Sequence, residues 1–200
     1  MKYLSVFLAL LMLVGIGSAQ WYPASPGAVI QTTGAAESSD DDQLFAAATG
    51  HCNQSTNIAK VTFLAQPDVT RNLIATFNAS TSGSIKITGT DASGDAITEN
   101  LTIASATTGA STKAFKTVTR IDADLTAGET NKTLKMGTGN LLGLRQTFPA
   151  TTVVLGTAVN GALEATAPAM TYSTTVVALN TIDTDSAPGG YVTKVLLMSF

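Results

Sequence analysis

The 200-residue chain has few of the residues that most protein chemistry requires. It contains one histidine and one cysteine, and only 12% of its residues are charged. A structural zinc site needs about four nitrogen or sulfur ligands, and a disulfide within one chain needs two cysteines, so the composition excludes both. No glycine-rich loop of the GxGxxG or GxxxxGK[ST] type is present. With 11 basic against 14 acidic residues and no basic cluster, nucleic acid is not an expected partner.

Threonine is abundant instead. The chain has 32 threonines, 15 serines and 17 glycines, and 44% of its residues are apolar. The apolar content argues against disorder. Threonine is β-branched and favours strands, and its hydroxyl can face water without carrying charge. The composition therefore predicts an all-β protein with a threonine-rich surface.

The first 19 residues form a separate segment. Lys2 is followed by an apolar run over residues 4–16 and by the small residues 17–19, which is typical of a secretory signal peptide. The run is shorter than the roughly 20 residues that a membrane-spanning helix needs. Two interpretations stay open: cleavage after Ala19, or retention of an apolar segment that a neighbouring subunit or a lipid surface must bury. Contact with a membrane is expected only through residues 1–19, if they are retained.

The rest of the chain divides into an arm and a domain. Residues 20–57 contain Pro23, Pro26 and an acidic run at 37–42, which predicts an extended arm or linker, with one helical turn at 42–48. From residue 58 to 200, strand signals recur about every 12 residues, and we expect an antiparallel β-sandwich of jelly-roll type. The expected strands are 59–64, 72–77, 83–90, 95–103, 114–121, 132–136, 151–155, 161–167, 174–179 and 191–198.

Turn residues separate these strands. Residues 91–94 (Asp-Ala-Ser-Gly) lie between two alternating apolar strands and predict a β-hairpin, because aspartate and glycine favour tight turns. Residues 137–139 and 188–190 are also predicted to be turns. Glu99 occupies an apolar phase of the second hairpin strand, which indicates a sheet edge or an interface.

Residues that could carry chemistry are few. The acidic run at 37–42 suggests calcium, but it lacks the alternating spacing of a calcium loop, and a solvated loop is favoured; calcium at subunit boundaries is left open. His51 and Cys52 are adjacent, and neighbours on an extended chain point to opposite faces. They do not predict a catalytic pair, although Cys52 could join two subunits of an exported protein.

Three aspartate pairs and four glycosylation sequons complete the candidates. An aspartate pair could hold calcium or act as an acid and a base, but exposed turn carboxylates are favoured. In a chain this rich in serine and threonine roughly two or three sequons are expected by chance, and the four would permit glycosylation only outside the cell. We therefore predict no catalytic, cofactor-binding or metal-binding residues. The aspartate pairs are Asp91 with Asp95, Asp122 with Asp124 and Asp183 with Asp185, and the sequons begin at Asn53, Asn78, Asn100 and Asn131.

Four segments in order carry a family resemblance. They read QPDVTRNL at 66–73, ITGTDASGDAITE at 87–99, KAFKTVTRI at 113–121 and GTGNLLGL at 137–144. This series resembles small β-rich structural proteins of tailed-phage virions, of the capsid or capsid-decoration type. Thr70 stands where that pattern usually has proline. The resemblance implies a β-rich subunit of the capsid or its decoration, with no catalytic residues to carry over.

Two functions follow as expectations. The first is a non-enzymatic structural subunit of a virus particle, located in the virion and bound to the capsid shell protein or to its own copies. The second is a secreted subunit of an extracellular filament, tube or surface layer. In the second case the N-terminal arm would add a strand to the next subunit, because open sheet edges accept one. Both expectations make the protein a homo-oligomer.

Overall fold

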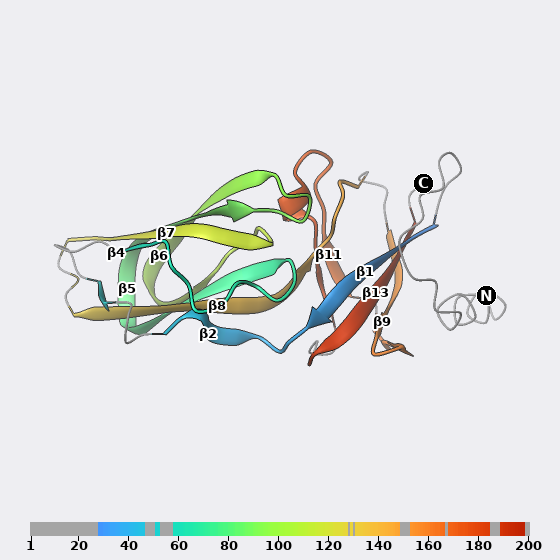
Figure 1. Cartoon of the computed structure of the whole chain (residues 1–200), viewed down its shortest axis with the longest axis horizontal. Coiled ribbons are helices and arrows are strands. Elements are labelled where there is room, and N and C mark those ends of the chain that lie inside the picture. The colour runs from blue at the N-terminus through green and yellow to red at the C-terminus, as the bar shows by residue number, and fades with distance from the viewer. Residues whose placement is uncertain are drawn as a thin grey trace.

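The computed structural model describes residues 28–46, 51–52, 58–127, 129, 131–148, 153–166, 168–184 and 189–198. The predicted signal segment 1–19 lies outside this part of the chain. Within the described residues the chain forms thirteen strands, one short 3-10 helix and no α-helix. The strands make two antiparallel sheets (Figure 1). The predicted all-β class and the sandwich-like arrangement are confirmed, whereas the jelly-roll topology stays a prediction.

The smaller sheet pairs the two ends of the described chain. Its order is β1-β13-β9-β10, so the first described strand lies beside the last. The larger sheet has the order β11-β12-β8-β5-β7-β4, with β2 and β3 also paired to β8, and β6 paired to β5. The strands are β1 (Ala28–Ala36), β2 (Asp40–Phe45), β3 (His51–Cys52), β4 (Ile58–Lys60), β5 (Arg71–Thr90), β6 (Ala96–Ala110), β7 (Thr117–Leu125), β8 (Lys132–Gly143), β9 (Val153–Val159), β10 (Ala162–Leu163), β11 (Ala169–Thr171), β12 (Thr181–Asp183) and β13 (Tyr191–Met198).

A long bent hairpin organises the larger sheet. β6 pairs along most of β5, but residues 71–77 of β5 also pair with β8, and residues 83–90 pair with β7. The β5–β6 register breaks between Thr76 and Gly83, and Ser105 on β6 has a positive φ of 49°. These irregularities allow the hairpin to bend, because a bulge increases local twist. The sheet thus folds into two layers that carry β7 and β8 (Figure 1).

The first core fills the space between these layers. Its residues alternate along both halves of β5 and along β7 and β8, as expected where each strand shows one face to the interior. The Ile85–Ile87 pattern that predicted the hairpin therefore faces this core. Its buried members include Leu44, Leu73, Phe77, Ile85, Ile87, Phe115, Ile121, Leu134 and Met136.

A second core joins the smaller sheet to the far end of β8. It contains Val195 and Leu197 of β13 together with Leu142 of β8 and Ile182 of β12. Strand β8 therefore contributes to both cores, with Leu134 and Met136 in the first and Leu142 in the second. The chain crosses between the cores again where β1 leads into β2.

Described residues of the predicted arm belong to the sheets. β1 pairs with β13 over the range 28–36, and β2 pairs with β8 through Asp40 and Phe45. Residues 28–36 and 40–45 are thus strands of the two sheets, and the extended arm over residues 20–57 stays a prediction. The helical turn predicted at 42–48 is wrong for its described part, because residues 42–45 continue β2.

Two further local predictions are wrong for identifiable reasons. The strand predicted at 174–179 is instead a loop with a 3-10 helix at Val177–Leu179. The buried Asn180 side chain closes this loop by donating to the carbonyl oxygens of Ser173 and Val176, both at 3.2 Å. The turn predicted at 137–139 lies inside β8, where a Cβ on Gly137 would come within 1.7 Å of the Asp40 carbonyl oxygen. That glycine marks the close approach of β2.

Candidate functional site

Arg71 links the two cores at the point where the chain crosses between them. This first residue of β5 is completely buried. Its Nε donates to the Gly139 carbonyl oxygen on β8 at 2.7 Å, and its Nη1 donates to the Glu37 carbonyl oxygen after β1 at 3.0 Å. The same Nη1 lies 3.0 Å from Asp68 Oδ1 and 3.2 Å from Oδ2. One guanidinium thus holds three segments together.

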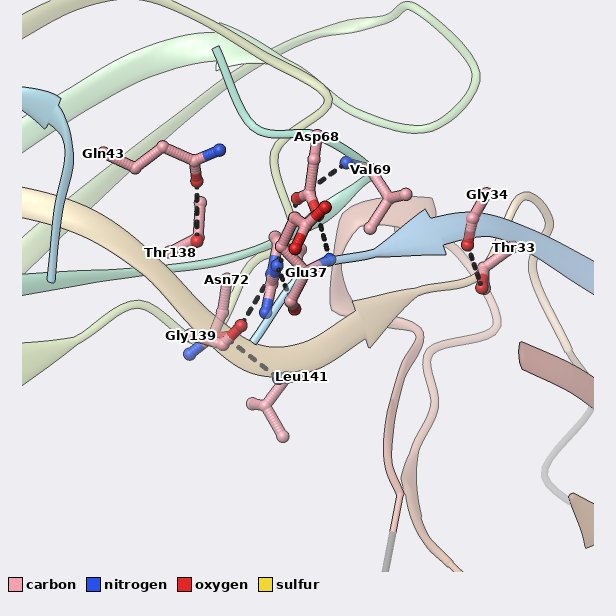
Figure 2. Close-up of polar contacts among 11 residues, drawn as sticks. Thr33, Gly34, Glu37, Gln43, Asp68, Val69, Asn72, Thr138, Gly139 and Leu141 are labelled. Carbon is pink, nitrogen blue, oxygen red and sulfur yellow. Dashed lines mark hydrogen bonds and ion pairs between the residues drawn. The ribbon is translucent and has the colours of Figure 1, made fainter. Parts of the chain in front are cut away.

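Asp68 completes this junction. Its carboxylate accepts hydrogen bonds from the backbone amides of Glu37 and Val69 as well as from Arg71. Only 15% of the Asp68 side chain is exposed, and ionised groups in such surroundings are stable only when paired and hydrogen-bonded. The Asp68 carboxylate is therefore bound by donors of the junction itself. Figure 2 shows Asp68, Val69 and Glu37 meeting beside Gly139.

Asn72 extends the junction toward β8. Its Oδ1 accepts from the Leu141 amide at 3.0 Å, and its Nδ2 donates to the Ser111 carbonyl oxygen at 3.4 Å. A Cβ on Gly139 would lie 2.3 Å from Asn72 Oδ1, so β8 needs a glycine here for the amide to fit. We refer to Arg71, Asp68, Asn72 and the backbone that they bind as the Arg71 junction.

The four segments that carry the family resemblance meet around this junction. Arg71 exchanges backbone hydrogen bonds with Phe115, and the Gly143 amide donates to the Thr70 carbonyl oxygen at 2.7 Å. The Lys116 amide donates to Thr90 at 2.8 Å, at the end of β5. In the sequence, Arg71 belongs to the first of these segments, QPDVTRNL at 66–73. A DxxR spacing before a strand is its only local signal, and many exposed ion pairs share that spacing.

The acidic run forms a compact exposed cluster. Carboxylate oxygens of Asp40, Asp41 and Asp42 lie within 4.8 Å of one another. Lys135 of β8 forms an ion pair with Asp41. The pKa of Asp42 is raised, first by its hydrogen bond with Asp40, then by partial burial and by the neighbouring negative charges. Residues 40–42 of the run thus lie on β2, whereas residues 37–39 lie in the exposed connection before it; calcium there stays a prediction.

The remaining aspartate pairs differ in burial and in hydrogen-bond partners. Asp91 is only 3% exposed, and its Oδ1 accepts the amides of Ser93 and Asp95 at 2.8 and 3.1 Å. Asp91 therefore stabilises the predicted hairpin turn. The expectation that it is exposed is wrong, because its carboxylate is buried against the turn amides. Asp122 forms an exposed ion pair with Arg120, whose Nη2 lies 2.7 Å from its carboxylate.

Other candidates are placed only in part. His51 and Cys52 are consecutive residues of β3 and pair with Thr133 and Lys132 of β8. Asp183 ends β12 and is exposed, whereas Asp185 and the Asn53 sequon lie outside the described residues. Asp124 is exposed on β7. The sequon residues Asn78, Asn100 and Asn131 are also exposed.

Two long strands form open sheet edges in the described part of the chain. β6 has 15 residues and pairs only with β5. Its single charged residue, Glu99, uses its carboxylate to accept the amides of Thr112 and Lys113 at 2.8 and 3.0 Å; the edge position suggested by the sequence is confirmed. β1 has nine residues without a charge and pairs only with β13. Among the described residues each of these strands thus lacks a strand partner on one side, and on β6 the Thr98 carbonyl oxygen accepts from Lys113 Nζ at 2.7 Å.

No protein-family model, curated protein or solved structure matches this chain. Among the residues that the structure describes, no helix has the length and apolar character needed to cross a membrane. The site therefore has to be interpreted from its own geometry. That geometry combines two open edges with a buried polar junction, in which Arg71 Nε and Nη1 are bound and Nη2 has no hydrogen-bond partner.

Proposed function

We propose that this protein is a non-enzymatic structural subunit of a virus particle, a capsid decoration or minor capsid protein, that assembles through repeated contacts between sheet edges. The observation that carries the proposal is the open edge of β6, which is 15 residues long and has one charged residue. The partners are further copies of the chain and the capsid shell protein. The location is the virion.

Edges of this kind favour association. Monomeric proteins usually block long edges with lysine, proline, inward charges or a covering segment. β6 has neither lysine nor proline, and its outward row of Thr98, Asn100 and Thr102 is exposed and uncharged. Glu99 and Lys113, whose Nζ donates to the Thr98 carbonyl oxygen at 2.7 Å, occupy the start of this edge. A strand added beside residues 100–110 would gain backbone hydrogen bonds away from these two charged side chains. Such contacts repeat when each copy presents the same edge.

The Arg71 junction supports a structural role, because it fixes the position of the two cores relative to each other. It ties the connection after β1, the start of β5 and the middle of β8 to one buried guanidinium. A rigid arrangement of the two cores keeps the edges of β1 and β6 in a fixed relation, which a regular particle requires. The resemblance to tailed-phage structural proteins supports the virion over other assemblies.

A secreted filament, tube or surface-layer subunit is the second candidate, and the position of β1 favours it. β1 is an edge strand that pairs only with β13, and residues 37–39 alone connect it to β2. A β1 donated by a neighbouring subunit would make the same hydrogen bonds to β13. The intact mass of the protein from its natural source separates the candidates: loss of residues 1–19 supports export, and retention supports the virion.

The edge contact is tested with a lysine on β6. We expect Thr102→Lys to weaken self-association of the purified full chain at least tenfold. Pairing would remove the lysine charge from water, which costs on the order of several kcal/mol. Sedimentation velocity and electron microscopy measure the assembly. The matched control is Thr166→Lys, which adds the same charge at an exposed bend outside the strands.

The second edge is tested in the same way. Ala35→Lys places a charge on the exposed surface of β1, and circular dichroism establishes that each variant keeps its fold. If Thr102→Lys and Ala35→Lys both assemble like the parent chain, assembly through sheet edges is refuted. A parent chain that remains monomeric at millimolar concentration would refute the structural role itself.

A further inference from the structure

A cleft of about 310 Å³ lies where the smaller sheet meets the layer that carries β7. One wall is β1, from Gln31 to Gly34, and the other walls come from residues 67–70, from the start of β7 and from the end of β8. Gln31 helps to shape it, because its buried side chain accepts the Arg145 amide at 3.1 Å. The cleft is thus formed by segments that the Arg71 junction holds in place.

The cleft carries an uncompensated positive charge. Lys116 and Arg145 both line it and are exposed. No carboxylate of the described residues forms an ion pair with either side chain. Asp68 also lines the cleft, but its charge is already paired with Arg71. Two cationic side chains therefore line the same cleft, and their chemistry fits carboxylates.

The strongest source of carboxylates on the same molecule is the run Asp40–Asp42. All three residues are exposed, and their carboxylates lie within 4.8 Å of one another. One cation, Lys135, is paired with the run, which leaves a net charge of about −2 on three carboxylates. Their crowding raises the pKa of Asp42, so additional cations would stabilise the ionised cluster.

We propose that the Lys116–Arg145 cleft of one copy receives the Asp40–Asp42 run of a second copy. This inference rests on the proposed assembly of the chain and assigns a second contact to it. Coulombic complementarity selects the partner and its register. The chain has a net charge of −3, so this local pairing of opposite charges must overcome a weak general repulsion, and the contact should weaken as salt is added.

The run cannot fill the cleft of its own chain. Asp40 is paired with Thr138 on β8, and the ion pair with Lys135 fixes Asp41 beside the same strand. None of the three aspartates lines the cleft. Every copy therefore offers one acidic run and one basic cleft, and the contact requires another molecule.

Two charge-reversed variants of the full chain test the contact. Lys116→Glu/Arg145→Glu makes the cleft acidic, and Asp40→Lys/Asp42→Lys makes the run basic. We expect each variant alone to associate at least tenfold more weakly than the parent chain, because attraction becomes repulsion at each contact. Mixed in equal amounts, the two should associate again. The acidic cleft of the first variant can then bind the basic run of the second, and the acidic run of the first can bind the basic cleft of the second. Sedimentation velocity at low and high salt is the measurement.

The control is Lys60→Glu/Lys86→Glu. It lowers the net charge by as much as Lys116→Glu/Arg145→Glu does, but at residues outside the cleft. It should associate like the parent chain. If parent, variants and control all assemble alike, the cleft contact is refuted while the proposed structural role stands. Failure of the mixture to associate, with both variants folded by circular dichroism, also refutes it. Should a reversal unfold the chain, Lys116→Gln/Arg145→Gln takes its place, and unchanged association by that variant is the refuting result.

Discussion

Arg71→Met is the most informative test of how the two cores are held together. Methionine keeps an unbranched apolar stem in the buried space that Arg71 occupies, and it removes every hydrogen bond that the guanidinium makes. Three acceptors lose this donor: the Asp68 carboxylate and the carbonyl oxygens of Glu37 and Gly139. The substitution therefore tests the junction with little change in packing.

The expected loss follows from these three groups. A buried polar group without a partner costs about 1–3 kcal/mol, and breaking one side of a buried ion pair costs about 3–5 kcal/mol. Asp68 keeps two backbone amide donors, and 15% of its side chain is exposed. These features place the loss near the lower end, at about 3–4 kcal/mol for the free energy of unfolding.

Urea denaturation of the full chain measures this free energy, and hydrogen exchange locates the change. Because Glu37 follows β1, the amides of β1 should exchange faster in Arg71→Met than those in the β5–β7 ladder. The double variant Arg71→Met/Asp68→Asn removes both charges, and we expect its loss to fall short of the sum of the single losses by at least about 1 kcal/mol. A loss below about 1 kcal/mol for Arg71→Met, or strict additivity, would refute the junction as a structural link.

Two further predictions concern the approach of β2 to β8. Gly137→Ala should cost roughly 2 kcal/mol or more in the free energy of unfolding, because its Cβ would overlap the Asp40 carbonyl oxygen. Gly34→Ala is the control, because a Cβ there meets only the side-chain atom Val69 Cγ1, at 2.9 Å, and no backbone atom; equal losses would contradict the explanation. Asp42→Asn should raise the urea midpoint at neutral pH, because the raised pKa of Asp42 means that its ionised form is disfavoured in the folded state. The penalty is present above the folded-state pKa and disappears below the ordinary aspartate value of 3.8, so the gain should vanish in acid, and a gain that is independent of pH would contradict it.

Local sequence patterns were sufficient for much of the fold. The strand at 191–198 was predicted with its observed bounds, because an apolar run follows a glycine pair. The hairpin was predicted because Ile85 and Ile87 alternate before an Asp-to-Gly turn, and β5 and β6 have that turn between them. In both places the residues within a short window determine the backbone conformation.

Predictions failed where distant segments determine the structure. Gly137 and Gly139 resemble turn residues, yet they lie within β8 because Asp40 and Asn72 approach them closely. The buried side chain of Asn180 closes a loop in a segment whose β-branched residues favour a strand. Arg71 depends on acceptors up to 68 residues away in sequence. No local pattern contains these partners, so the junction could not be recognised as a site.

The pairing of β1 with β13 has a consequence for synthesis of the chain. The smaller sheet joins residues 28–36 to residues 191–198, so β1 does not have this partner until residues 191–198 have left the ribosome. The two layers around the first core involve residues up to about 143 and can form earlier, since domains tend to fold as their residues emerge. During this interval β1 is an unpaired, uncharged strand, and nascent chains on neighbouring ribosomes could capture it. Translation speed over residues 144–198 should therefore affect the yield of correctly folded protein.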